Sequence, residues 1–248
     1  MFGRAIVFLY GLICYLIFFV TFLYAIGFVG NIVVPKSIDT GPGVPLAEAL
    51  IINTLLLSLF AIQHSVMARQ WFKRAWTKIV PEPVERSTYV LLASLVLLLL
   101  FWQWRPMLEI IWDVRNPTGR IVLQGLFWIG WGQVLASTYL VDHFGLFGLK
   151  QVYRYLKGQP EEPSPFKTPA LYKIVRHPLY LGFIIAFWST PRMTLGHLFF
   201  AAVCTVYILV AIQFEERDLV RFYGETYSRY RKEVSMIFPL RRPRKTPD

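Results

Sequence analysis

The 248-residue sequence predicts an all-α fold, a polytopic transmembrane helical bundle. Hydrophobic residues make up 55% of the chain and charged residues only 17%, whereas a soluble domain usually carries about 25% charged residues. The apolar residues lie in long runs, and a helix needs about 20 of them to cross a bilayer. We therefore expect five to six hydrophobic segments, of which the last two form a helical hairpin, together with an interfacial amphipathic helix.

The first part of the chain, residues 1–142, predicts four transmembrane helices. Three tryptophans near the ends of these segments fit the aromatic belt of a membrane boundary. Glycines in the last segment, Gly125, Gly130 and Gly132, would allow a neighbouring helix to approach closely. The apolar stretches that predict the four helices run from about 5 to 34, 46 to 67, 89 to 104 and 121 to 141.

The second part, residues 143–239, predicts an interfacial helix, a loop, a hairpin and a C-terminal helix. Residues 144–173 are first amphipathic and then rich in proline, which indicates a helix followed by an ordered loop or, alternatively, a flexible linker. A short apolar segment begins at Pro178 and ends by Pro191, and a longer one follows. Residues 240–248 are a basic tail, and the whole chain 1–248 is expected to form a single domain.

The charge distribution predicts the orientation in the membrane. The formal net charge is +11, but the basic residues flank apolar segments instead of forming one face, so no nucleic-acid partner is predicted. Residues 69–86, 150–176 and the tail from Arg217 carry five, six and nine Lys or Arg, whereas the alternate loops carry one, three and one. By the positive-inside rule, both termini lie in the cytoplasm, most simply at a bacterial inner membrane.

Two polar motifs frame the predicted hairpin. The run Arg176-His177-Pro178-Leu179-Tyr180-Leu181-Gly182 opens the short apolar segment, and Glu215-Glu216-Arg217 closes the long one. A hairpin brings these two ends together at one side of the membrane. Charges at this depth are costly unless they are paired or used, although a motif of this kind can also serve as an interfacial anchor. The four histidines are scattered without ligand spacing, so no metal site is predicted.

The order of these motifs resembles the integral-membrane methyltransferases that use S-adenosylmethionine, a family that includes isoprenylcysteine carboxyl methyltransferase and the phospholipid methyltransferases. The resemblance extends through Phe222-Tyr223-Gly224-Glu225 and covers roughly residues 166–239. It implies that S-adenosyl-L-methionine is the cofactor and that residues 143–239 bind it. The binding residues that the resemblance implies are Phe166, Lys167, Tyr172, Arg176, His177, Pro178, Leu179, Tyr180, Gly182, Tyr227 and one or both of Glu215 and Glu216.

The acceptor is indicated by one departure from the family and by three upstream motifs. The prenylcysteine enzymes carry a substrate-binding Arg about one turn before the Glu, where this chain reads Val210-Ala211-Ile212-Gln213-Phe214. The stretches 63–69, 85–89 and 142–149 resemble family members that methylate a small thiol. The resemblance therefore implies in-line methyl transfer to methanethiol, giving dimethyl sulfide, in a membrane-embedded pocket. The alternatives are a lipid or isoprenoid-linked acceptor, an NADPH-dependent sterol-type reductase, and a membrane protein without enzymatic activity.

Four upstream residues are the predicted catalytic set: His64, Arg86, Asp142 and His143. His64 is the first candidate for a proton acceptor, because imidazole titrates near neutral pH; a histidine hydrogen-bonded between helices is the alternative. Arg86 with Glu85, and Asp142 with His143, can orient such a base or pair with each other. Beyond the thiol and the lipid bilayer, the sequence indicates no obligate protein partner.

Overall fold

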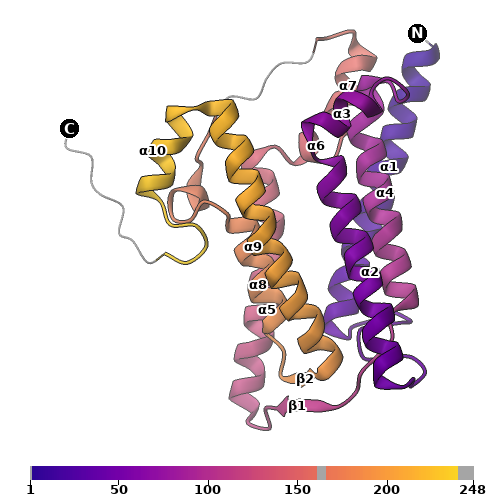
Figure 1. Cartoon of the computed structure of the whole chain (residues 1–248), viewed down its shortest axis with the longest axis vertical. Coiled ribbons are helices and arrows are strands. Elements are labelled where there is room, and N and C mark those ends of the chain that lie inside the picture. The colour runs from indigo at the N-terminus through magenta and orange to yellow at the C-terminus, as the bar shows by residue number, and fades with distance from the viewer. Residues whose placement is uncertain (1, 161–165, 240–248) are drawn as a thin grey trace. The chain divides into compact units, whose positions relative to one another are not determined.

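The computed structural model describes residues 2–160 and 166–239 and confirms the all-α prediction (Figure 1). Within these residues, five helices are long and apolar enough to cross a membrane: α1, α2, α4, α5 and α9. The chain is thus an integral membrane protein. In order, the elements are α1 (Phe2–Gly30), α2 (Leu46–Met67), α3 (Gln70–Trp76), α4 (Glu82–Gln103), β1 (Ile110–Asp113), α5 (Pro117–Val141), α6 (His143–Leu146), α7 (Leu149–Lys157), the 3-10 helix η1 (Ala170–Lys173), α8 (Pro178–Trp188), β2 (Arg192–Thr194), α9 (Leu195–Tyr223) and α10 (Glu225–Glu233).

The chain divides into two compact units, which are described separately. The first unit contains α1 to α4, α6, α7 and the first turn of α9. The second contains α5, η1, α8, the rest of α9 and α10. Strands β1 and β2 pair as a two-stranded sheet.

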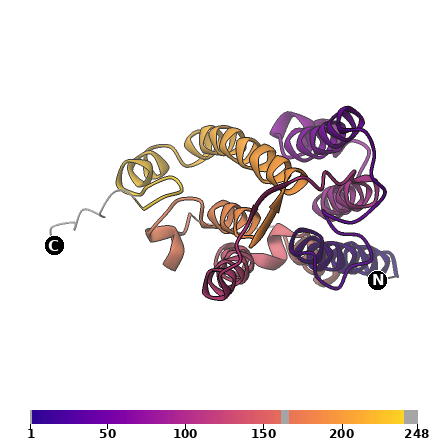
Figure 2. The same cartoon turned by 90° about the horizontal axis from the view of Figure 1, so that it is seen from below.

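Within the first unit, α4 packs against both α1 and α2 and lies between them (Figure 2). Four consecutive residues near the start of α4 bond to four different segments, namely α6, the turn before α7, α1 and α2, because successive side chains on a helix point about 100° apart. These contacts tie the helices together through hydrogen bonds that the bilayer cannot supply. They are Arg86 Nε to Leu146 O (2.7 Å), Ser87 Oγ to Gly148 O (3.2 Å), Thr88 Oγ1 to Tyr10 OH (2.9 Å) and Tyr89 OH to His64 Nδ1 (2.9 Å).

The predicted amphipathic helix is α7, which packs against α1. Its one buried side chain, Val152, fits over Gly11, where an added Cβ would lie 2.5 Å from Val152 Cγ2. Gly148, just before α7, has φ of +85° and faces the backbone of Ser87 at a distance that leaves no space for a side chain. Of the loop predicted to follow α7, residues 161–165 lie outside the described residues, as does the basic tail.

Within the second unit, α5 and α8 touch backbone to backbone. A Cβ added to Gly130 would lie 2.7 Å from Gly182 O and 2.6 Å from Ala186 N. Small residues permit such close contacts between membrane helices. Of the three glycines predicted to act in this way, only Gly130 does so, since an added Cβ at Gly125 or Gly132 would meet nothing within 4 Å.

The predicted hairpin is formed by α8 and α9, with side chains joining the two helices. Trp188 Nε1 donates to Thr205 Oγ1 at 3.0 Å, and the rings of Phe187 and Phe200 lie 5.1 Å apart. With 11 residues, α8 is about 16 Å long, which is roughly half of the hydrocarbon thickness. The non-helical backbone that follows is bonded within the unit, because Thr190 O accepts from Trp112 Nε1 at 3.1 Å.

Candidate functional site

The site begins where the chain enters α8. Residues 175–177 are extended and run beside residues 235–236, with a parallel bridge between Val175 and Ser235. Arg176 N donates to Ser235 O at 2.8 Å, and His177 N donates to Met236 O at 3.1 Å. Pro178 then occupies the first helical position, where its missing N–H has no partner to lose. The backbone on both sides therefore fixes Arg176 and His177 at the start of α8.

Glu216, on α9, is a buried carboxylate that two arginines and a histidine approach. Its Oε1 accepts from Arg176 Nε at 2.7 Å and lies 3.1 Å from His177 Nε2. The side chain of Glu216 is only 7% exposed, and Arg231 of α10 approaches its Oε2 to 3.9 Å. A buried charge is tolerated when it is paired and hydrogen-bonded in this way.

Arg176 extends the same cluster to α10. Its Nη1 donates to Arg231 O at 2.9 Å and also to Val234 O. One guanidinium thus links the carboxylate of α9 to the backbone that ends α10. These contacts tie α9 and α10 together through Arg176.

Glu215 is adjacent in sequence but lies in a different environment. Its side chain is 43% exposed, compared with 7% for Glu216. Oε2 of Glu215 accepts from Tyr180 OH at 2.9 Å, and His177 Nδ1 lies 4.0 Å from it. Glu215 therefore presents a carboxylate that a ligand can reach, whereas Glu216 is surrounded by internal partners.

Aromatic rings gather beside these charges. Phe166 lies 5.1 Å from Tyr223, 5.9 Å from Tyr227 and 5.5 Å from Tyr230, measured between ring centroids. Tyr230 OH donates to Tyr172 O at 2.6 Å, which joins η1 to α10. Burial, followed by the charge of Glu215, raises the pKa of Tyr172 to about 12. Burial also raises the pKa of Tyr227 and Tyr230, so these three phenols are neutral at physiological pH.

The structure thus brings together most, but not all, of the predicted cofactor-binding residues. Lys167 is exposed on the loop before η1, and Gly182 contacts α5. Pro178 is buried, and its carbonyl accepts from Gln133 Nε2 at 2.7 Å. Leu179 is partly buried on the first turn of α8. The predicted residues that meet around the carboxylates and rings are Phe166, Tyr172, Arg176, His177, Tyr180, Glu215, Glu216 and Tyr227.

All four predicted catalytic residues lie in the first unit. His64 is bonded to Tyr89 and stacks on Phe60, with ring centroids 5.2 Å apart. Arg86 donates to a backbone carbonyl, Leu146 O, and lies over the Tyr89 ring at 5.0 Å. Tyr89, which is not one of the four, thus contacts two of them, His64 and Arg86.

Asp142 and His143 are neighbours with separate partners. Asp142 begins α6, where its Oδ1 accepts from Gly145 N at 3.1 Å and its Oδ2 pairs with Lys150 Nζ at 2.6 Å. His143 is buried, and its Nε2 lies 2.9 Å from Tyr15 OH. Burial lowers the pKa of His143, so it is neutral at physiological pH. These contacts give Asp142 a structural role as a helix cap.

Several partners in these clusters were not predicted as site residues. Tyr89 falls inside the 85–89 motif, but only the packing of α4 on α2 reveals its contact with His64. Tyr15 stands in a uniformly apolar span, which gives no signal of a contact with His143. Gln133 is a polar residue in a membrane-spanning helix, a feature that marks it for attention. Tyr230 lies five residues after the quoted C-terminal motif, and its bond to Tyr172 O depends on the tertiary fold.

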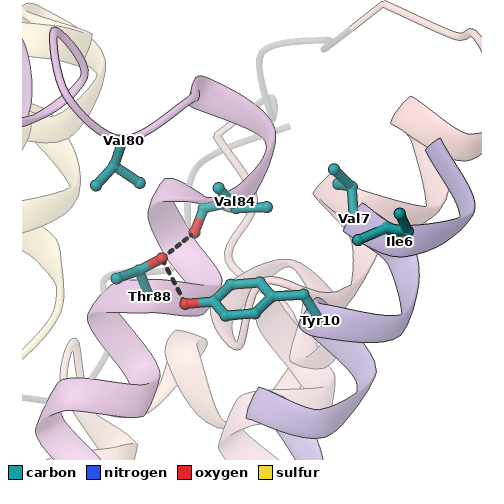
Figure 3. A pocket seen from close by; sticks show the side chains of 6 residues that line it. All are labelled: Ile6, Val7, Tyr10, Val80, Val84 and Thr88. Carbon is teal, nitrogen blue, oxygen red and sulfur yellow. Dashed lines mark hydrogen bonds between the residues drawn. The ribbon is translucent and has the colours of Figure 1, made fainter. Parts of the chain in front are cut away.

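The first unit also contains an apolar hollow with a volume of about 370 Å³ (Figure 3). Its polar feature is the hydrogen bond between Tyr10 and Thr88. None of the predicted catalytic residues lines it. The lining residues are Ile6, Val7, Tyr10, Val80, Val84 and Thr88.

The fold and the site define a polytopic membrane protein with a charged, ring-lined cluster at the end of a helical hairpin. Methanethiol S-methyltransferase 1 of Bradyrhizobium diazoefficiens is 59% identical over 239 residues, which cover 96% of this chain and 84% of that protein. Methanethiol S-methyltransferase of Mycobacterium tuberculosis is 56% identical over 95% of this chain and 97% of its own length. The chain belongs to the methanethiol S-methyltransferase family, which confirms the membrane methyltransferase class predicted from the motifs.

A more distant relative is the nurim homolog of Drosophila pseudoobscura pseudoobscura. It is 31% identical over 68% of this chain and 70% of its own length. No protein-family model and no solved structure matches the chain.

The buried position of Glu216 predicts a stability effect that Glu215 does not share. Glu216→Gln leaves Arg176 and His177 without their carboxylate, and removing one partner of a buried ion pair costs about 3–5 kcal/mol. Glu215→Gln affects a half-exposed group and should cost about 1 kcal/mol or less. Unfolding of the purified variants in detergent measures this difference. Equal stability of the two variants would contradict the assignment of Glu216 as the internal hub.

Proposed function

We propose that the protein transfers the methyl group of S-adenosylmethionine to methanethiol, which forms dimethyl sulfide and S-adenosylhomocysteine. The observation that carries this proposal is the high identity, over nearly the whole chain, to proteins named methanethiol S-methyltransferase. The choice of methyl donor rests on the motif resemblance and on the chemistry of the second unit.

The cluster in the second unit has groups that suit each part of the methyl donor. Glu215 can accept hydrogen bonds from an ammonium or from ribose hydroxyls. The guanidinium of Arg231, whose side chain is 49% exposed, can bind a carboxylate. The rings around Phe166 offer faces against which an adenine can stack. These residues, together with His177 and Tyr180, are the ones that would hold the molecule.

The proposed chemistry requires few groups of the protein. When bound, S-adenosylmethionine supplies an activated methyl group on a sulfonium. The thiol sulfur forms a bond to the methyl carbon, the bond from that carbon to the sulfonium sulfur breaks with its electron pair, and the thiol proton leaves. A simple alkanethiol has a pKa no lower than the cysteine value of about 8.5, so a proton acceptor accelerates the reaction at neutral pH. His64 is the candidate for this role.

The turn of α9 that precedes Glu215 and Glu216 is mostly apolar, which favours a small neutral acceptor. In the turn of residues 210–214, where the family's substrate-binding Arg would lie, Ile212 is fully buried and packs with Ile208 and Ile237. The next residue, Gln213, is polar and exposed, and its Nε2 lies 3.9 Å from Met236 Sδ. This turn supplies no cation for an acceptor carboxylate, which separates the proposal from the prenylcysteine enzymes. A lipid acceptor remains the second candidate, because the site belongs to a membrane protein.

The acceptor preference is tested by product analysis. Membranes that contain the protein should release dimethyl sulfide into the headspace when supplied with methanethiol and S-adenosylmethionine. A thiol of similar reach that carries a carboxylate should react poorly, because the α9 turn has no cation to pair with it. Membranes without the protein are the control. Methylation of a membrane lipid without dimethyl sulfide would instead support the lipid acceptor.

The role of Glu215 is tested by calorimetric titration with S-adenosylmethionine. Glu215→Gln removes a charge-assisted hydrogen bond worth about 1.5–3 kcal/mol, so we expect affinity to fall about tenfold to a hundredfold. Asp218→Asn, on the same helix and paired with Arg221 at 3.9 Å, is the matched control and should bind normally. Equal affinities in both variants would remove Glu215 from the binding site.

We also propose that the protein lies in a bacterial inner membrane with its termini and the Glu215–Glu216 cluster in the cytoplasm. This proposal rests on the distribution of Lys and Arg among the loops. Cysteines introduced at Lys36 and Lys157 test it in intact cells. An impermeant thiol reagent should label position 36 and spare position 157, and the opposite pattern would reverse the orientation.

A further inference from the structure

The apolar hollow of the first unit lies between the start of α1 and the start of α4, and all of its lining belongs to that unit. In Figure 3, Val80 and Val84 face Ile6 and Val7 across it. Its volume of about 370 Å³ is about twelve times the volume that one water molecule occupies in the liquid, roughly 30 Å³. A molecule with only two heavy atoms, such as methanethiol, would leave most of this volume empty.

The two hydroxyl groups in the lining are bonded within the protein. Thr88 Oγ1 donates to Val84 O at 2.8 Å, and Tyr10 OH lies 2.9 Å from Thr88 Oγ1 (Figure 3). Because the threonine has only one proton, which goes to Val84 O, the bond between the two hydroxyls uses the proton of Tyr10. The lining therefore has no hydroxyl proton left for a polar ligand, whereas a hydrocarbon chain needs none.

The hollow lies where two membrane-spanning helices begin. Its α1 residues belong to the first three turns of that helix, and Val84 and Thr88 belong to the first two turns of α4. Ile6 is 54% exposed, so the hollow opens to the surface of the unit. The ends of membrane-spanning helices lie near lipid headgroups and the adjoining part of the acyl chains. A lipid chain can therefore enter the hollow from the side.

Basic side chains flank the lining on both of its walls. On α1, Arg4 precedes Val7 by three residues, which places it one turn earlier and about 60° around the helix. On the other wall, Lys78 precedes Val80 by two residues. Both basic residues are exposed, and no ion pair joins either of them to a carboxylate among residues 2–160 and 166–239.

The acidic residues at the start of α4 are placed differently. Glu82 precedes Val84 by two residues, so the two side chains point about 200° apart, to nearly opposite sides of the helix. Glu85 is partly buried, and its Oε1 is inaccessible to solvent. Positive charge thus predominates beside the hollow, which suits the phosphate of an anionic lipid.

We propose that the hollow is a binding site for one phospholipid with an anionic headgroup. One acyl chain lies between α1 and the start of α4, against Val7 and Val84. The headgroup phosphate lies near Arg4 and Lys78. The bound lipid fills the space that the two helices leave between them, and its binding does not depend on the proposed methyl transfer.

Filling the hollow tests the acyl-chain site. Val84→Trp and Val7→Trp each place a large ring in it, one from each wall, and Val20→Trp makes the same change at a position of α1 that is 62% exposed. Native mass spectrometry of the full chain in detergent, with added phosphatidylglycerol, measures binding. We expect one lipid on the wild type and on Val20→Trp, and a loss of about tenfold or more in both filled variants, because each excluded methylene costs about fourfold.

Two results would overturn the acyl-chain site. One is the absence of phosphatidylglycerol from the wild type, and the other is wild-type binding in both filled variants. Thermal unfolding in detergent checks that the filled variants fold, and it supplies a second measure of binding. Added phosphatidylglycerol should raise the Tm of the wild type and of Val20→Trp, because the lipid binds the folded state. An equal rise in Val84→Trp and Val7→Trp would place the lipid elsewhere and contradict the proposal.

The headgroup preference is tested with phosphatidylcholine, which carries no net charge. The wild type should bind phosphatidylglycerol more tightly, and Arg4→Gln or Lys78→Gln should each reduce that preference about fivefold. The matched control is Arg115→Gln, which removes an exposed charge in the loop before α5 and should leave the preference unchanged. Equal binding of the two lipids by the wild type, or an unchanged preference in the double variant Arg4→Gln/Lys78→Gln, would overturn the anionic headgroup.

Discussion

The site in the second unit depends on the burial of one negative charge. The carboxylate of Glu216 is stable in its environment only because cationic and hydrogen-bonding side chains reach it from two other segments. Arg176 and His177 arrive on the extended chain before α8, and Arg231 arrives on α10. The same guanidinium of Arg176 then bonds to backbone carbonyls at the end of α10. A single carboxylate thus determines how α8, α9 and α10 meet.

The first unit joins its helices mostly with uncharged groups. Residues 86–89 of α4 reach α1, α2, α6 and the turn before α7 through hydrogen bonds to carbonyls, a hydroxyl and an imidazole, and of these four residues only Arg86 is charged. Neutral hydrogen bonds avoid most of the desolvation cost of an ion pair, and in a bilayer they still satisfy polar groups that no water can reach. The second unit is thus joined around a buried ion pair, whereas α4 of the first unit is joined to its neighbours mainly by hydrogen bonds between uncharged groups.

Much of the fold could be predicted because the bilayer imposes length and polarity on each segment. The lengths of the apolar runs identified the long transmembrane helices, and Pro178 and Pro191 marked the limits of the short α8. The amphipathic pattern after residue 143 indicated α7. The hairpin also predicted that His177 and Glu216 would meet. The difference between Glu215 and Glu216 could not be predicted, because adjacent helical residues point about 100° apart and the sequence does not show which direction is buried.

The side-chain partners in the first unit could not be predicted from the sequence either. Asp142 pairs with Lys150, eight residues further on, instead of with the adjacent His143. His64 and His143 each bond to a tyrosine on another helix. Such pairs depend on the rotation and depth of packed helices, which hydrophobic patterns determine only coarsely. The roles of these residues in catalysis and in cofactor binding stay predictions.

The contact of Gly130 with Gly182 has a consequence for motion around the ligand cluster. With backbone against backbone, α5 and α8 cannot roll or slide past each other without atoms colliding. Tyr180, on the first turn of α8, and His177, the residue before it, therefore keep their place relative to α5. By contrast, η1 and α10 are held by side-chain hydrogen bonds from Tyr230 and Arg176, which can break one at a time without collisions of backbone atoms.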